Sequence, residues 1–439
     1  MKHKSHREIM EEIFYAALEA VDPYESVRCH RDTILSICRE NNSEKLFLVG
    51  FGKAACQMAR AVEDFAEDLI EKGILITKYG HCLSPHKLQK IRVYEAGHPL
   101  PDGNGLAATK EIIDLAKGLD ENSLLLCLIS GGGSALFVYP YNDVSLDDKR
   151  KTTELLLKAG ADIEELNAVR KHISAVKGGR LAELAYPSRI ISLILSDVIG
   201  DKLDVIASGP TSPDETTFGD ALKVAERYNL LNRLPRKVLE VLRNGASGSI
   251  QETPKEGNRI FDRIENIIIG SNRKALKAAK TQAEFLGFKT EILSSQISGE
   301  AREVGKSIAK KAMKAKNASR TNRDNAICFI SGGETTVTVR GTGLGGRNME
   351  LALSFAMEIE DTGGITLLSA GTDGTDGPTD AAGAIVNSAT MKTARANGLD
   401  PVEYLENNDS YNFFKQIDGL LITGPTGTNV MDIQILIVE

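Results

Sequence analysis

The sequence predicts an α/β protein built from two α/β domains. Three observations lead to this prediction. Short, nearly continuous apolar runs recur along the chain, which is typical of strands buried on both faces, as in parallel sheets. Longer amphipathic segments separate these runs, so that strands and helices alternate. The length of 439 residues exceeds what a single hydrophobic core usually serves.

The apolar runs give the expected strands their positions, which are 46–50, 74–77, 124–130, 190–196, 266–270, 326–331 and 365–370. Before the first run, apolar residues between 9 and 21 recur at helical spacing and predict an opening helix. The segment 242–263 is polar and rich in turn residues, which favours a linker. We therefore expect an N-terminal domain over residues 1–250 and a C-terminal domain over residues 260–439.

Composition and charge narrow the class of function. The net charge of −7 argues against nucleic acid as a partner, because binding to a phosphate backbone needs a basic face. The longest apolar runs have only about seven residues, so no membrane span is expected. The six cysteines are scattered without a CxxC pair. We therefore expect neither a disulfide framework nor a zinc site, and a reducing cytoplasm as the location.

Small and polar residues directly follow six of the expected strands. The segments concerned are 50–53, 130–133, 196–197, 270–273, 331–334 and 371–374. In open α/β sheets, ligands bind beyond the carboxyl ends of the strands, and glycines there let backbone amides approach an anion. A single glycine turn is more often an ordinary tight turn. Six such segments at strand ends favour a ligand site.

The first of these turns, GFGKAA at 50–55, matches the G-x-G-x-x-A pattern of dinucleotide-binding proteins. That pattern also requires an acidic residue at the end of the next strand to hold a ribose, and here Lys78 follows that strand. We therefore expect the turn to bind an anion other than NAD. Lys53 adds a positive charge at a helix start, where the helix dipole already favours phosphate or carboxylate. A lysine that is merely exposed at a helix start is the plainer alternative.

The segment 331–353 is the most specific motif of the chain. It joins a Ser-Gly-Gly turn, Glu334, the strand-like TTVTVR, the glycine loop GTGLGG, and then Arg347 and Asn348 at the start of a helix. An arginine presents a planar fork that bonds two oxygens of a carboxylate or phosphate at once. The motif therefore predicts a second place where an anion binds.

Two further segments concentrate charge. The segment 167–183 is basic, with Lys177 and Arg180 among its residues, and fits either an anion clamp or a solvated basic helix. Asp197 directly follows a strand, where a carboxylate is placed to act as a base or a metal ligand, and Asp373 lies among glycines. An acidic loop combined with basic glycine turns suggests Mg²⁺ with phosphates.

Together, these motifs resemble the glycerate 2-kinases that carry a C-terminal MOFRL domain. The resemblance extends over nearly the whole chain and rests on motifs such as ISGGGSAL, NAVRKHISAVKGGRLA, SGGETTVTVRGTGLGGRNMELAL and AGTDGTDGPTDAAGA. It implies ATP, Mg²⁺ and D-glycerate, with 2-phosphoglycerate and ADP as products. It also implies a Rossmann-like N-terminal domain with a mostly parallel sheet and a smaller C-terminal α/β domain of the MOFRL type.

The resemblance and the charge pattern together give candidate site residues. Lys53 and Arg347 fall on motif positions regarded as essential in the family, and we expect them at the transferred phosphoryl group or the glycerate carboxylate. Asp197 is the candidate base for the 2-hydroxyl, or a metal ligand. Glu334 and Asp373 are candidate Mg²⁺ ligands. The expected substrate- and phosphate-binding residues are Gly52, Ser130, Gly131, Gly132, Ser134, Lys177, Arg180, Ser331, Gly332 and Asn348.

Two other functions fit parts of the sequence. An NAD(P)H-dependent hydroxypyruvate reductase would explain the two glycine matches, at 50–55 and 341–346, but the missing ribose-binding acid and the Asp-rich loop count against it. A non-catalytic sugar-acid binding protein would explain the basic turns, but it has little use for so many carboxylates at strand ends. Small molecules are the expected partners in all three cases, and a homodimer stays open.

Overall fold

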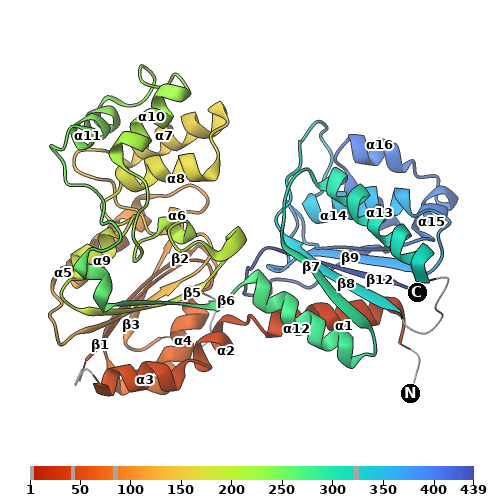
Figure 1. Ribbon diagram of the computed structural model, residues 1–439, viewed down its shortest axis with the longest axis horizontal. Coiled ribbons are helices and arrows are strands. Elements are labelled where there is room, and N and C mark those ends of the chain that lie inside the picture. Colours follow the sequence, from red (N-terminus) through yellow and green to blue (C-terminus); the bar gives the residue numbers. More distant parts are fainter. Residues whose placement is uncertain (1–3, 41–44, 83–87, 320–325) are drawn as a thin grey trace. The chain divides into compact units, whose positions relative to one another are not determined.

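The computed structural model describes residues 4–40, 45–82, 88–319 and 326–439 (Figure 1). The chain forms two compact units, which we call the larger unit (23–269) and the smaller unit (1–22 with 270–439). The first 22 residues thus belong with the C-terminal part of the chain. The boundary after residue 269 also lies beyond the segment 242–263, which holds the end of α11 (Arg236–Ala246) and the 3-10 helix η4 (Arg259–Arg263).

The larger unit contains a six-stranded sheet in the order β3-β2-β1-β4-β5-β6 within the described ranges. Its strands are β1 (Leu46–Phe51), β2 (Ile70–Lys78), β3 (Ile91–Ala96), β4 (Leu124–Ile129), β5 (Arg189–Leu195) and β6 (Ile264–Gly270). All pairs from β3 to β5 are parallel. The predicted mostly parallel sheet is therefore confirmed, and the carboxyl ends of these strands lie at one edge.

Both faces of this sheet are covered by helices, which explains the continuous apolar runs. Val49 and Cys127 pack on one face, where the core includes residues of α5 (Gly103–Lys117) and α9 (Arg180–Ala185). Leu48 and Leu126 pack on the opposite face against α3 (Arg31–Glu40) and α4 (Ala55–Ala66). Because side chains alternate along a strand, neither face can carry polar residues without burying them.

A second group of helices in the larger unit has a core of its own, to which Leu156, Val169 and Phe218 contribute. The group consists of α7 (Leu146–Ala159), α8 (Ile163–His172), α10 (Phe218–Arg227) and α11, which Figure 1 shows together away from the sheet. Shorter elements of this unit are α2 (Pro23–Arg28), η1 (Glu67–Leu69), α6 (Gly133–Leu136), η2 (Ile199–Asp201) and η3 (Ile206–Ser208).

The smaller unit contains a second six-stranded sheet, in the order β11-β10-β9-β12-β8-β7 within the described ranges. Its strands are β7 (Lys289–Ile297), β8 (Ile327–Gly333), β9 (Ile365–Gly371), β10 (Gly383–Asn387), β11 (Leu420–Leu421) and β12 (Asp432–Val438). The sheet is mixed, because β12 lies between β8 and β9 and is antiparallel to both. The predicted two-domain α/β architecture is confirmed.

Helices cover both faces of the second sheet as well. Figure 1 shows α1 (His6–Glu19) and α12 (Asn272–Phe285) on one face, and α13 (Ala301–Ser319) and α14 (Arg347–Glu358) on the other. Helix α1 is the predicted opening helix, and Ser5 and Glu8 cap it reciprocally. The remaining helices of this unit are α15 (Thr390–Ala396), α16 (Pro401–Glu406) and α17 (Ser410–Gln416).

One expectation about the cysteines is wrong. Cys56 in α4 and Cys82 after β2 form a disulfide, although they are 26 positions apart and share no CxxC motif. Helix α4 begins, and strand β2 ends, at the same edge of the sheet, so the fold brings together two cysteines that spacing alone does not pair. Cys127 and Cys328 are free and fully buried, as expected for cysteines inside apolar strands.

Candidate functional site

Two glycine turns meet at the edge of the larger unit's sheet where β1 and β4 end. The two strands are paired through Phe51 and Ile129, so the turns that follow them start side by side. The amide of Lys53 donates to the carbonyl of Gly131 at 2.9 Å. The amide of Ala54 donates to Ser130 Oγ at 3.1 Å. The turns after β1 and β4 are therefore one hydrogen-bonded structure.

The close contact between these two turns requires a residue without a side chain at position 52. The φ of Gly52 is +131°, and a Cβ at this position would lie 2.2 Å from Ser130 Oγ and 2.5 Å from the Ser130 carbonyl oxygen. In a dinucleotide-binding fold, the corresponding glycine leaves room for the pyrophosphate at the helix start. Here Ser130 fills that space and accepts one of the first amides of the α4 region. Gly52 and Ser130, both predicted to bind substrate, contact each other in this structure.

We expect Gly52→Ala to lower the free energy of unfolding of the larger unit by about 3 kcal/mol or more, because the backbone would be strained and the added methyl group would overlap Ser130. Denaturant unfolding of the variant checks this value. The matched control is Gly103→Ala at the start of α5, where an added Cβ meets nothing within 4 Å. An equal effect of the two substitutions on stability would contradict the close packing of the turns.

The next two glycines, Gly131 and Gly132, are surrounded by charged side chains. A Cβ on Gly131 would lie 2.5 Å from Asp197 Oδ2. A Cβ on Gly132 would lie 3.0 Å from the His98 ring and 3.5 Å from Cγ of Lys53. The amide N–H groups of Gly131 and Gly132 donate to no residue that the structure describes. Free amides beside a lysine are suited to bind an anion, and the adjacent carboxylate is suited to take a proton.

His98 lies at this edge of the sheet among positively charged residues. Burial, together with the positive charges of Lys53, Lys78 and His81, lowers the pKa of His98 from 6.5 to about 4. The neutral imidazole is therefore the form present at pH 7. A bound anion would counteract the neighbouring positive charges, which add to the effect of burial.

This pKa shift predicts a pH dependence of stability. The unfolded chain takes up a proton at His98 below pH 6.5 whereas the folded chain does not until about pH 4, so the contribution of His98 to stability is lost as the pH falls from 6.5 to 4. Because His98 is only half-buried, solvent screening reduces the effect, and relative to His98→Gln the wild-type protein should lose about 1–2 kcal/mol over this range. Denaturant titrations of both proteins at pH 7 and pH 4.5 measure the difference. A constant difference would contradict the half-buried, neutral imidazole.

Ser134 and Lys177 lie near the same turn, and Arg180 follows Lys177 in the chain. Ser134 Oγ is 3.1 Å from Ser208 Oγ. Lys177 is buried, and its Nζ donates to the carbonyl of Ala207 at 3.0 Å. Arg180 is also buried, donates to the carbonyl of Gln251 and lies over the Tyr141 ring. The basic segment 167–183 is thus not a solvated helix, because Lys171, Lys177 and Arg180 are buried.

In the smaller unit, Arg347 begins α14 and binds two carboxylates. Its Nε and one terminal nitrogen bond the two oxygens of Asp432 at 2.6 and 3.0 Å, and its other terminal nitrogen bonds Glu334. Burial disfavours the charge, but the carboxylates of Asp432 and Glu334 outweigh it and raise the pKa of Arg347 further. Three of the five guanidinium N–H groups are therefore used, and two remain for an external anion.

Asp432 occupies the centre of this arrangement. In the sheet it lies opposite Gly333 of β8 and Gly371 of β9, so it is placed between the two glycine turns of the smaller unit. Its side chain is 1% exposed, and burial raises its pKa although Arg347 opposes the rise. Asp376 is nearby and equally buried: it accepts the amides of Asn348 and Met349, and burial raises its pKa to about 7.

The predicted magnesium ligands lie in different surroundings. Glu334 is bound by Arg347, and Asp373 Oδ1 accepts the amide and the hydroxyl of Thr375. Asp373 Oδ1 and Asp432 Oδ1 both lie within 3.5 Å of the point where a Cβ on Gly371 would be. The described residues include no cluster of three or more acidic, His or Cys side chains that could hold a metal. Two carboxylates still fit Mg²⁺, which usually keeps several waters and binds substrate phosphates.

Three other predicted binding residues are engaged within the smaller unit. Ser331 Oγ donates to Gln434 at 3.0 Å. Gly332 lies against Asn272, whose amide oxygen would be 2.2 Å from an added Cβ. Asn348 is held by Asp376 and accepts a bond from Ser369 Oγ at 2.8 Å. These residues shape the ends of β8 and α14, and their roles in binding stay predictions.

Comparisons with known proteins bear on the chemistry of these turns. Residues 9–243 match the family described as "Domain of unknown function (DUF4147)", and residues 327–432 match the MOFRL family. The chain is 47% identical to D-glycerate 2-kinase from Thermotoga maritima over 422 residues, covering 96% of each chain.

This chain belongs to the glycerate 2-kinase family.

The motif resemblance is thereby confirmed, and a solved structure agrees with it. The crystal structure of glycerate kinase from Thermotoga maritima matches with a TM-score of 0.88 at 45% identity, covering 98% of this chain and 99% of that chain. Some proteins that are similar to this chain carry the name of a different enzyme. A protein from Agrobacterium vitis with hydroxypyruvate reductase in its name is 41% identical, covering 89% of this chain and 98% of its own length.

The sequence does not predict two titratable residues of the candidate site in this member of the glycerate 2-kinase family. His98 follows β3, which was not among the expected strands, although its position in EAGHPLPDGNG directly after an apolar-alternating segment was a usable signal. Asp432 begins β12, whose run DIQILIV was also not interpreted as a strand. Because these two strands were not predicted, the residues at their ends were not considered as site residues.

Proposed function

We propose that this protein is a glycerate 2-kinase, which transfers the γ-phosphoryl group of ATP to the 2-hydroxyl of D-glycerate and yields 2-phosphoglycerate and ADP. The observation that carries the proposal is the 47% identity to D-glycerate 2-kinase over 96% of both chains. The glycine turns support it, because phosphoryl transfer needs positioning and charge stabilisation more than covalent chemistry from the protein.

The larger unit offers groups for the transfer itself. We assign the free amides of Gly131 and Gly132 and the side chain of Lys53 to the oxygens of the transferred phosphoryl group. Asp197, beside Gly131, accepts the proton of the 2-hydroxyl while the oxygen–phosphorus bond forms and the bond to ADP breaks. Gly52 and Ser130 hold this turn in place without contacting the substrate.

The smaller unit offers a second set of groups for anionic oxygens. We assign the two unused N–H groups of Arg347 to a phosphate or carboxylate, with Asp432 and Glu334 fixing the orientation of the guanidinium. Asp373 and Asp432 are the residues that would hold Mg²⁺. When bound, the ion would supply positive charge to the phosphates.

A hydroxypyruvate reductase is the second candidate, because one similar protein has that activity in its name. The geometry of the larger unit argues against it. Ser130 occupies the space at Gly52 that a dinucleotide pyrophosphate needs, and β2 ends at Lys78 instead of an acidic residue. A non-catalytic sugar-acid binding protein would leave Asp197 without a role as a base.

Two parallel incubations test the proposal. In one, the protein receives D-glycerate, ATP and Mg²⁺, and the release of ADP is followed. In the other, it receives hydroxypyruvate with NADH or NADPH, and the nicotinamide absorbance is followed. ADP release that depends on glycerate, with constant nicotinamide absorbance, is the expected result. Nicotinamide oxidation without ADP release would establish the reductase instead.

The location follows from weaker observations. Within the described ranges, no helix combines the length and apolar character needed to cross a bilayer. We propose the cytoplasm, where ATP is abundant, and small molecules as partners. The disulfide between Cys56 and Cys82 is the observation that opposes this location, because such bonds are usually reduced there.

A further inference from the structure

Three basic side chains in the larger unit lie together without an ion-pair partner among the described residues. They are Lys149 on α7, Arg170 on α8 and Lys177 after α8, which we call the basic cluster. Lys149 is 5% exposed and donates to the carbonyl of Arg170 at 3.3 Å. Lys177 is 1% exposed and donates to the carbonyl of Ala207 at 3.0 Å. No carboxylate of the described residues forms an ion pair with any member of the cluster.

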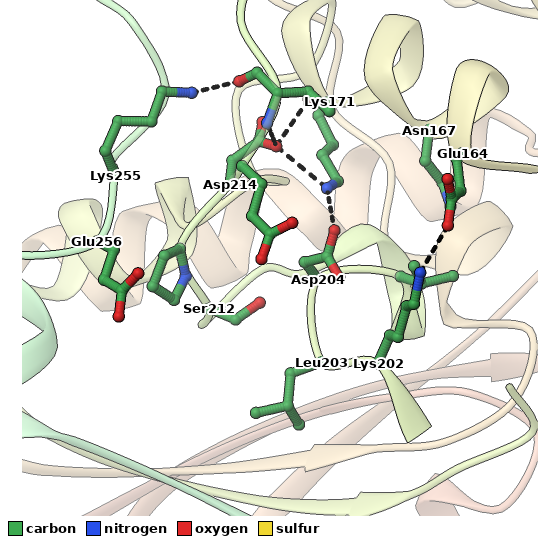
Figure 2. A pocket seen from close by; sticks show the side chains of 14 residues that line it. Glu164, Asn167, Lys171, Lys202, Leu203, Asp204, Ser212, Asp214, Lys255 and Glu256 are labelled. Atoms are coloured by element: carbon green, nitrogen blue, oxygen red, sulfur yellow. Dashed lines mark hydrogen bonds and ion pairs between the residues drawn. The ribbon is translucent and has the colours of Figure 1, made fainter. Parts of the chain in front are cut away.

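The next residue on α8 shows the usual arrangement of a buried lysine. Lys171 is 1% exposed, and its Nζ lies 2.9 Å from Asp204 and 3.1 Å from Asp214 (Figure 2). These three residues line a pocket of about 740 Å³ together with Glu164, Asn167, Lys202 and others. The fold can therefore neutralise a buried lysine with carboxylates, and it does so one position away from the basic cluster.

The basic cluster is electrostatically unfavourable in the free protein. Each buried ammonium group has three donors, and only one is used in each lysine. Burial, together with the charge of Arg170, lowers the pKa of Lys149 from 10.5 to about 7. Burial lowers the pKa of Lys177 well below its ordinary value, and Lys149 and Arg170 add to it. A negatively charged group would satisfy the unused donors and cancel the mutual repulsion.

The cluster adjoins the glycine turn of the candidate site. Ala207, which accepts the bond from Lys177, has its Cβ 3.0 Å from the point where a Cβ on Gly133 would be. The following residue, Ser208, lies 3.1 Å from both Ser134 Oγ and Asn167 Oδ1. Ser134 and Arg170 remain partly exposed. Hydroxyl and amide groups thus lie beside the positive charges.

We propose that Lys149, Arg170 and Lys177 form the subsite that binds the carboxylate of the small hydroxy acid, with Ser134 at its side. This assignment rests on the proposed function. The three cations and the neighbouring hydroxyls match an acid that carries a carboxylate next to hydroxyl groups, and Arg170 can hold a carboxylate through its planar fork.

Burial distinguishes a small acid from a nucleotide. A triphosphate is bulky and highly charged, and the largely buried lysines of the cluster leave little surface for it. The amides of Gly131 and Gly132 with Lys53 already provide a separate place for a phosphoryl group. A carboxylate bound at the cluster and a phosphoryl group at the turn would both lie in the larger unit, near Asp197.

Calorimetric titration tests the subsite without relying on turnover. D-glycerate is titrated into the full-length wild-type protein and into Lys149→Met and Lys177→Met, each with and without a non-hydrolysable ATP analogue and Mg²⁺. We expect roughly 10- to 100-fold weaker glycerate binding in both variants, as for the loss of a charged hydrogen bond. The affinity for the ATP analogue should change less than twofold. The control Lys151→Met changes an exposed lysine on the same helix and should leave both affinities unchanged.

Stability gives a second readout that does not depend on binding. Removing an unpaired buried charge should leave the melting temperature of ligand-free Lys149→Met unchanged or raise it. A lower melting temperature with unchanged glycerate affinity would mean that the lysine is structural and would overturn the proposal. Weaker binding of the ATP analogue alone, or no glycerate binding by the wild type, would overturn it too. Cluster-dependent glycerate binding without ADP release would refute only the kinase function.

Discussion

Arg347→Lys is expected to lower kcat by roughly two to three orders of magnitude, about 3–4 kcal/mol, as for the loss of one preorganised donor. The guanidinium holds both oxygens of Asp432 side-on, contacts Glu334, and still has two N–H groups for an anion. A lysine keeps the charge but cannot make these contacts from one planar group. If Arg347 acts mainly in the transition state, KM for glycerate should change little.

The variant must be separated from a folding defect. Asp432 is buried and loses its bidentate partner, so a moderate fall in melting temperature is expected alongside the kinetic effect. The matched control is Arg340→Lys, which makes the same exchange at an exposed position in the preceding loop. A rise in KM with constant kcat would mean that Arg347 only holds the acid. Wild-type kinetics in Arg347→Lys would remove this residue from the site.

Lys53→Met is expected to have a comparable effect, with kcat/KM reduced by about three orders of magnitude. The side chain of Lys53 reaches the edge of the Gly132 turn, where the free amides alone would have to stabilise the charge of the transferred group. Steady-state kinetics at varied ATP and glycerate measure the loss. Because Lys53 also lowers the pKa of His98, its removal should move that pKa upward.

The expected change in the pKa of His98 shows whether Lys53 lies at the glycine turn. A titration of His98 in the Lys53→Met variant should show a higher pKa than in the wild type. The melting temperature at pH 7 should not fall, because the substitution removes one of several positive charges that repel one another. Lys110→Met on α5 changes an exposed lysine and serves as the control. Full activity together with an unshifted His98 would show that Lys53 is only an exposed residue at a helix start.

Much of the fold could be predicted because its signal is local. Each of the seven apolar runs lies in a strand to within one residue, since a strand covered on both faces has no position for polar residues. Strand direction has no such signal: β8 and β9 are separated by β12, which joins from the C-terminus and is antiparallel to both. The assignment of the first 22 residues to the smaller unit likewise depends on packing of α1 against α12, which no local pattern encodes.

The candidate site could be predicted only in part, because glycine has several uses. Lys53, Gly131, Gly132 and Asp197 were found from strand-end position, and the structure places them around one turn. Gly52 and Ser130 have the same sequence signature but contact each other, which depends on the approach of two strands. Lys149 of the basic cluster lies on an otherwise ordinary amphipathic helix, and only its burial distinguishes it.

Phosphorus NMR of the reaction product distinguishes phosphoryl transfer to the 2-hydroxyl from every alternative. The protein is incubated with D-glycerate, ATP and Mg²⁺, and the proton-coupled spectrum of the phosphoester is recorded. Transfer to the 2-hydroxyl links phosphorus through oxygen to a carbon with one hydrogen, so we expect a doublet from 2-phosphoglycerate beside the ADP signals. A triplet would indicate transfer to the 3-hydroxyl and contradict the assignment, and a spectrum of unchanged ATP under these conditions would contradict the kinase function itself.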